Sequence, residues 1–383
     1  MADITANADA WSSTEASNSP SGATTIGTGL DDNLRATQAG VVLFVERSPH
    51  THNFALTAAV ASNALTIALK GKDANDPSSI NKARIPFRNV TPATGDYSQV
   101  VVSAATSLVI SSGSTMGATS ATAFRLWIVA FNDAGTLRLG AINCLTTSAN
   151  AGSGRNVDAI YPLSAWGIAS STAEGGAGAA DSAQVFYTGT AVTSKVYTVL
   201  GYMTWETGLT TAGTWDAVPT RIQLFGAGVP LPGAAVQGKL SVSGAVATGT
   251  TVIPLDDTIP QSAEGDQYMS LEVTPTSAAN VLHWSSRAVA ASSAGAGNAL
   301  TAALFQDATA NALAAVITSF GTTAVEKILV LEHSMLANTT VATTGKIRIG
   351  SNSAGTTTFN GRSGARDYGG VMASRLAVQE VMA

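Results

Sequence analysis

Short runs of β-branched and alternating apolar residues, separated by turn-forming residues, fill the chain from Val41 onward. Each run has the length of a strand, and the residues between runs are rich in Gly, Asn, Asp, Ser and Pro, which favour turns. Such runs occupy residues 64–69, 99–102, 107–110, 123–131, 137–142, 184–187, 197–205 and 222–225, and then 240–244, 252–255, 268–273, 281–284, 299–305, 327–332, 345–349 and 376–381. Their spacing predicts an all-β fold of sandwiched sheets.

The composition supports a folded chain with few charges. Charged residues make up 12% of the 383 residues, and hydrophobic residues make up 45%. A disordered chain carries more charge and less Val, Ile and Leu. The net charge of -5 and the absence of an Arg/Lys cluster give no electrostatic reason to expect a nucleic-acid partner.

Residues 226–233 read Gly-Ala-Gly-Val-Pro-Leu-Pro-Gly and predict a domain boundary. Neither a strand nor a helix continues through two prolines bracketed by glycines. We therefore expect an N-terminal extended arm and short helix over residues 1–45, then two β-sandwich, jelly-roll-like modules over residues 46–233 and 234–383.

Two local patterns predict loops. Residues 132–135, Asn-Asp-Ala-Gly, indicate a hairpin turn. The glycine-rich residues 174–180 lack the order of a phosphate-binding motif and indicate a flexible loop.

The first 45 residues consist of a polar arm followed by one amphipathic segment. Thr28 or Asp31 can cap a helix there, and Asp31 and Asp32 suit the positive end of its dipole. Spacing alone fits a helix that packs on the chain's own core and also the seam of a short coiled coil. The residues that carry this spacing of four and three are Leu30, Leu34, Thr37, Val41 and Phe44.

The arm contains Trp11, Asn18, Pro20 and Gly22, and residues 30–35 read Leu-Asp-Asp-Asn-Leu-Arg. This arrangement resembles the N-terminal virion-attachment region of tailed-bacteriophage fibre and spike proteins. The resemblance implies a homotrimer, with residues 1–45 bound to tail, portal, adaptor or collar proteins. It assigns virion attachment to Trp11, Asn18, Pro20, Gly22, Asp31, Asp32 and Arg35, and the oligomer seam to Leu30, Leu34, Val41 and Phe44.

Both β modules also resemble parts of phage fibres. The first, from Leu65-Thr-Ile-Ala-Leu to Phe225-Gly-Ala-Gly-Val-Pro, is similar to a module of tail-fibre proteins. The second ends in Leu376-Ala-Val-Gln-Glu and is similar to the jelly-roll-type modules at the outer ends of such fibres. These matches are looser than that of the arm.

The single cysteine, Cys144, excludes an intrachain disulfide and suits a reducing cytoplasm, so we expect it in a core. The first 30 residues do not have the pattern of a signal peptide. No apolar run approaches the roughly 20 residues that span a bilayer, so we expect no membrane insertion. Together with the virion attachment that the resemblance implies, these features predict a virion protein made in the host cytoplasm.

His50 and His52 form the only histidine pair with metal-ligand spacing. On a strand both imidazoles would face one side, and a trimer would gather six. A solvated turn after Pro49 explains the pair as well, so we expect no metal and no cofactor. The 25 acidic residues show no clustered or aromatic-framed pair of the glycosidase kind, and no Gly-x-Ser-x-Gly elbow is present. We therefore expect no enzyme.

Trp205 and Trp215 enclose the most suggestive loop for ligand binding, because aromatic faces stack on the apolar faces of sugars. Tryptophans that close a sandwich core with their N–H paired are the commoner alternative.

The sequence therefore predicts a structural virion protein, a trimeric tail-fibre subunit that contributes to adhesion to a host cell-surface glycan or protein. Within the virion, a head-decorating or collar fibre is the alternative. A glycan-degrading tailspike and a lectin-like binder without an anchor are alternatives from other classes.

Overall fold

The computed structural model describes residues 35–41, 51–89, 96–144, 167–226, 229–230 and 232–383. Helical structure in this part of the chain comprises residues 35–41 and the 3-10 turn η4 (Tyr368–Gly370), and the other regular elements are strands. The predicted all-β class is therefore confirmed. No helix in the described residues is long and apolar enough to cross a membrane. The chain forms two compact units that divide between Val229 and Pro230.

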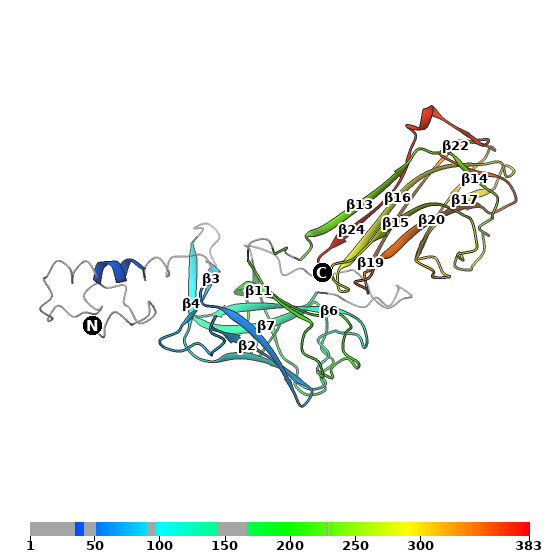
Figure 1. The fold of residues 1–383 in the computed structure, drawn as a ribbon. Helices are drawn as coiled ribbons and strands as arrows, with labels where there is room; N and C mark the ends of the chain where they lie inside the picture. Colours follow the sequence, from blue (N-terminus) through cyan, green and yellow to red (C-terminus); the bar gives the residue numbers. More distant parts are fainter. Residues whose placement is uncertain (1–34, 42–50, 90–95, 145–166, 227–228, 231) are drawn as a thin grey trace, which may run out of the picture. The chain divides into compact units, whose positions relative to one another are not determined.

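The first unit contains three sheets (Figure 1). Its strands are β1 (Ala55–Ala61), β2 (Ala64–Lys70), β3 (Ala83–Arg88), β4 (Tyr97–Val102), β5 (Thr106–Ile110), β6 (Phe124–Asp133), β7 (Thr136–Asn143), β8 (Ile168–Ala169), β9 (Thr172–Ala173), β10 (Tyr187–Thr188), β11 (Lys195–Trp205) and β12 (Arg221–Leu224). The largest sheet has the order β12-β11-β6-β7-β10-β9, with β8 paired to β11. A second sheet has the order β1-β2-β5, and β3 pairs with β4.

Strand β6 is buried on both faces, which explains why residues 126–131 are a continuous apolar run rather than an alternating one. Leu126 and Ile128 belong to the core that also contains residues of the two smaller sheets. Val129 and Phe131 belong to a separate cluster with Val192.

Two local predictions are confirmed at the ends of β7. Ala134 and Gly135 turn the chain with positive φ angles of 51° and 89°, and the Gly135 N–H donates to Asn132 Oδ1 at 2.8 Å. Cys144 follows β7 and is buried, and burial raises the pKa of its thiol.

The glycine-rich residues 174–180 are held by specific contacts rather than forming the free loop that their composition predicts. Glu174 accepts hydrogen bonds from the backbone N–H of Ser111 at 3.2 Å and from its hydroxyl at 2.9 Å. A Cβ added to Gly113 would lie 2.6 Å from the backbone of Gly178. Glycine is therefore required where these two loops meet.

The second unit is built from two facing sheets and some short strands (Figure 1). Its strands are β13 (Ala235–Ser243), β14 (Ala247–Gly249), β15 (Asp266–Val273), β16 (Val281–Ser292), β17 (Ala299–Gln306), β18 (Ala314–Ser319), β19 (Lys327–Leu336), β20 (Thr343–Ser351), β21 (Thr357–Phe359), β22 (Gly361–Arg362), β23 (Ala365–Arg366) and β24 (Ser374–Val381). The first sheet has the order β13-β24-β16, with β19 on the free side of β16 and with β21 and β14 beside the end of β16. The second sheet has the order β15-β20-β17-β18, and β22 pairs with β23.

The eight long strands of this unit have jelly-roll connectivity. In chain order, the first strand pairs with the eighth, the eighth with the third, and the third with the sixth. The second pairs with the seventh, the seventh with the fourth, and the fourth with the fifth. This order is that of two Greek keys in two facing sheets, as predicted. The described strands of the first unit form three sheets without this connectivity.

Side chains that point between the two sheets form one apolar core. In β16, Leu282, Trp284 and Ala288 occupy alternate positions and belong to this core, as a half-buried strand requires. Gly345 gives Trp284 its space, because a Cβ at residue 345 would collide with the indole ring.

The two sheets of the jelly roll are covered unequally. Residues 250–265 lie against the second sheet: the Ile253 N–H donates to the Ser351 carbonyl at 3.0 Å, and Arg348 Nε donates to the Glu264 carbonyl at 2.8 Å. Phe305, which points away from the core, is only 2% exposed. Among the described residues, the outer face of the first sheet has no such cover, and Leu240, Val242, Ile328 and Val330 on its edge strands are 55% to 61% exposed.

Glu380 is a buried carboxylate that holds one end of the sandwich together. It points inward from β24 and is 0% exposed. It accepts hydrogen bonds from Gln237 Nε2 at 2.5 Å, Asn280 Nδ2 at 2.5 Å, and both the backbone N–H and hydroxyl of Thr276 at 2.8 and 2.7 Å. Burial alone would raise the pKa of this carboxyl, but these hydrogen bonds hold it below its ordinary value.

Glu380→Gln is expected to lower the free energy of unfolding by about 1–3 kcal/mol at neutral pH, because an amide cannot accept all of these bonds. The folded-state pKa is depressed, so the wild-type contribution is present above the ordinary value of 4.5 and is lost as pH falls through the folded pKa. Chemical denaturation from neutral pH downward measures both effects. The exposed Glu332→Gln serves as the control, with a change within about 0.5 kcal/mol. Equal stability of the two variants would contradict this role.

Candidate functional site

Most predicted attachment and seam residues lie outside the residues that the structure describes. These are Trp11, Asn18, Pro20, Gly22, Leu30, Asp31, Asp32, Leu34 and Phe44. Arg35 begins the described helix, and Val41 ends it with 40% exposure. Thr37 is also exposed, whereas Gln38 and Ala39 are buried. Val41, the seam residue within the described part of the chain, is therefore exposed in the single chain.

Trp205 and Trp215, the predicted ligand-binding residues, are core residues with 1% and 0% exposure. The indole N–H of Trp205 donates to the Ala217 carbonyl and that of Trp215 to the Ser114 carbonyl, both at 2.9 Å. Phe124 stacks on Trp205 with ring centroids 4.8 Å apart. The rings cannot stack on a sugar from these positions, so that interpretation is corrected in favour of tryptophans that close a core.

The histidine pair near the N-terminus is described only in part. His52 is exposed, and its backbone N–H and carbonyl bond to those of Arg84 at 2.9 and 3.0 Å. His50 lies outside the described residues. Within the described residues, no group of three His, Cys, Asp or Glu side chains is arranged to hold a metal ion.

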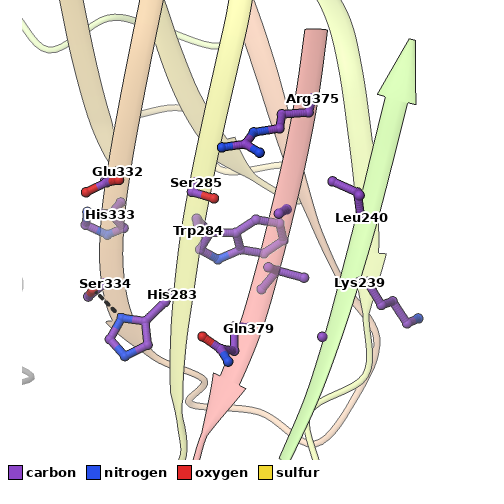
Figure 2. A pocket seen from close by; sticks show the side chains of 13 residues that line it. Lys239, Leu240, His283, Trp284, Ser285, Glu332, His333, Ser334, Arg375 and Gln379 are labelled. Carbon is purple, nitrogen blue, oxygen red and sulfur yellow. Dashed lines mark hydrogen bonds between the residues drawn. The ribbon is translucent and has the colours of Figure 1, made fainter. Parts of the chain in front are cut away.

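A groove crosses the uncovered face of the jelly roll (Figure 2). Its volume is about 640 Å³, within the range of about 300–1,000 Å³ that is usual for ligand sites. All four long strands of the first sheet contribute to it. The lining residues are Gly238, Lys239 and Leu240 of β13, His283, Trp284 and Ser285 of β16, Glu332, His333 and Ser334 of β19, and Arg375, Ala377, Val378 and Gln379 of β24.

Strand register explains why this face is hollow. Ser285 lies opposite Glu332 on one side and Ala377 on the other, and Ala377 lies opposite Leu240. This row has two small side chains in its centre and larger ones at both ends. The centre of the row therefore forms a floor, and Glu332 and Leu240 stand above it.

The adjacent row is polar and contains Gly238, Gln379, His283 and Ser334 in register. His283 Nδ1 and Ser334 Oγ are 2.5 Å apart and share a hydrogen bond (Figure 2). Burial lowers the pKa of His283, so its imidazole is neutral at neutral pH.

A neutral imidazole beside a hydroxyl is the pair from which a serine nucleophile is made. Acyl transfer also needs a third group to orient the base. In the described residues, no carboxylate is hydrogen-bonded to His283. The groups of the groove are thus suited to bind a polar ligand through donors and acceptors on a rigid sheet.

Sequence reasoning missed this groove, although part of its signal was present. In residues 281–287, polar side chains alternate with Leu282 and Trp284, which is the pattern of a strand with one solvent-exposed face. The partners of those polar residues come from β19 and β24, and only the register shows which of them share a row.

No protein-family model and no curated protein sequence matches the chain. Among solved structures, it is similar to the VP2 subviral particle of infectious bursal disease virus, with 11% identity, 88% of this chain and 79% of that chain covered, and a TM-score of 0.22. T=1 particles derived from the same virus give 12% identity, 88% and 76% coverage and a TM-score of 0.23. Dimeric latent PorU from Porphyromonas gingivalis gives 8% identity, 70% and 25% coverage and a TM-score of 0.20. TM-scores of this size do not establish a shared fold, and we draw no functional conclusion from them.

Trp205→Ala is expected to lower the free energy of unfolding by about 3–5 kcal/mol, because it opens a cavity beside Phe124 and Trp215. Chemical denaturation of the full-length protein measures this loss. Trp205→Phe is the matched control, since it keeps an aromatic ring in the stack and should cost clearly less. An alanine variant as stable as wild type would show that Trp205 is not a core residue.

Proposed function

We propose that this chain is a structural, non-enzymatic component of a tailed-phage virion, a trimeric tail-fibre subunit anchored through residues 1–45. The anchor is supported by the Trp11, Asn18, Pro20 and Gly22 arm and the Leu-Asp-Asp-Asn-Leu-Arg sequence at residues 30–35, which resemble virion-attachment regions. The same anchor fits a head-decorating or collar fibre, and the place of the protein on the particle distinguishes these.

The observation that carries the proposal is the complete jelly roll of the second unit with one sheet face left open. Jelly rolls with two Greek keys are common in viral capsid and lectin domains. A fold alone does not determine function, so the groove on the open face carries the adhesive part of the proposal. Its polar rows suit contact with a host-surface glycan or protein.

The helix at residues 35–41 supports self-association. Val41 lies on the predicted seam and Thr37 shares its helical spacing; both are exposed in the single chain, whereas Gln38 and Ala39 are buried. An exposed valine at a seam position gains free energy when a second helix covers it. Three such helices around an axis would bring the three anchors together at one site of the virion.

Removal of residues 1–40 is expected to leave two folded β units that no longer attach to particles, because the docking residues precede the first strand. The measurement is the copy number of the truncated protein on purified particles, together with its thermal unfolding in isolation. A chain that lacks only residues 2–10, which precede Trp11, is the control and should attach normally. Normal copy number of the long truncation would contradict the anchor.

Val41→Asp is expected to shift the purified protein from trimer to monomer, since it places three carboxylates in an apolar seam. Analytical ultracentrifugation at micromolar concentration measures the state. Ala36→Asp is the matched control, because residue 36 is exposed on the same helix but off the seam. A wild-type chain that is monomeric both in solution and on particles would refute the trimer.

A further inference from the structure

Two arginines face each other on the open sheet of the jelly roll. Arg287 of β16 lies directly opposite Arg375 of β24 in the strand register. Side chains in such pairs have Cβ atoms about 4.5–5.5 Å apart, and like charges there destabilise a sheet. None of the ion pairs recorded for the described residues includes either arginine. Arg287 Nη1 donates a long hydrogen bond of 3.4 Å to the Ala373 carbonyl.

This arginine pair lies at one end of the groove. Arg375 lines the groove, and its guanidinium lies beside Ser285 (Figure 2). Arg287 is two positions from Ser285 on the same face of β16. His283 and Gln379 follow in the next row. A ligand that lies along these strands meets two positive groups first, then a low floor, and then polar side chains.

The charges do not result from a basic composition, because the chain carries a net charge of -5. Each guanidinium presents a planar fork of N–H donors that matches a carboxylate, and the register places two of them side by side. An anion between them also removes the repulsion that the pair suffers in the free protein.

We propose that this groove binds an acidic saccharide, a hexuronic acid polymer of the host-cell surface. One sugar carboxylate lies between Arg287 and Arg375, and neighbouring hydroxyls exchange hydrogen bonds with Ser285, Glu332 and the row beyond. The inference rests on the adhesive role in the proposed function and deepens it by naming the ligand class.

A second copy of this chain fits the same face less well. The exposed apolar side chains lie at its two edges, Leu240 and Val242 on β13 and Ile328 and Val330 on β19. The two central strands, β16 and β24, separate these edges, and most of their outward side chains are polar. Protein interfaces have an apolar centre and a polar rim, whereas this face has the reverse arrangement. A saccharide, with hydroxyls and carboxylates along its length, matches a polar centre.

The test titrates the full-length protein with an oligogalacturonate and, separately, with its methyl ester, by isothermal titration calorimetry. The ester keeps the hydroxyl groups and loses the charge. We expect the acid to bind, with an affinity that falls as salt is added. The affinity for the ester should be lower by at least about ten-fold, since a charge-assisted hydrogen bond is lost.

Arg287→Gln and Arg375→Gln should each weaken binding of the acid about ten-fold. Arg366→Gln, an exposed arginine on the β22–β23 hairpin, is the matched control and should bind as wild type. Because each groove variant removes a like-charge pair, its thermal midpoint should equal or exceed that of wild type. That result excludes misfolding as the reason for lost binding.

Equal affinity for acid and ester, no binding by wild type, or unchanged affinity in both groove variants would overturn the inference. A changed oligomeric state of these variants in sedimentation would also overturn it, because the face would then join copies of the chain. Shortening of the oligogalacturonate during the titration would contradict the non-enzymatic function and leave the binding inference standing.

Discussion

The pairing of β24 between β13 and β16 is the interaction on which the second unit depends. Strand β24 pairs with β13 and β16, which lie far from it in the sequence. A long loop must therefore close before the contacts that stabilise this sheet can form. The register of this strand turns Glu380 inward, toward Asn280, and Arg375 outward, opposite Arg287. A slip of one residue would exchange the two faces of β24, placing an arginine in the core and the core side chains in solvent.

Unequal cover of the two sheets then determines where this unit can meet a ligand. Residues 250–265 lie against the second sheet, and Phe305 is buried there although it points away from the core. The first sheet keeps an open outer face with a hollow centre, because Ser285 and Ala377 are small where the row ends are large. Position in the register, rather than any unusual residue, produces the groove.

The sequence predicted many of the strands and the hairpin at residues 132–135, since these depend on local periodicity and turn residues, but residues 252–255 form no strand. The jelly roll of the second module was expected from the resemblance to phage-fibre modules. Sequence-based prediction failed for features that depend on which distant segments pack or pair with one another. Trp215 lies in a loop and Trp284 on β16, and only the packed structure shows that both rings are inside. The groove was missed for the same reason, because His283 and Ser334 are neighbours only through the pairing of β16 with β19.

Core and candidate site share two strands, β16 and β24, whose side chains alternate between the two faces of the sheet. In β16, Leu282 and Trp284 belong to the core, and Trp284 also borders the groove that His283 and Ser285 line from the outer face. In β24, Leu376 and Val378 pack inward, while their neighbours face out. Exposed substitutions usually change stability by less than about 0.5 kcal/mol, whereas core truncations cost several times more. The outward positions are therefore free to change while the inward positions keep the fold.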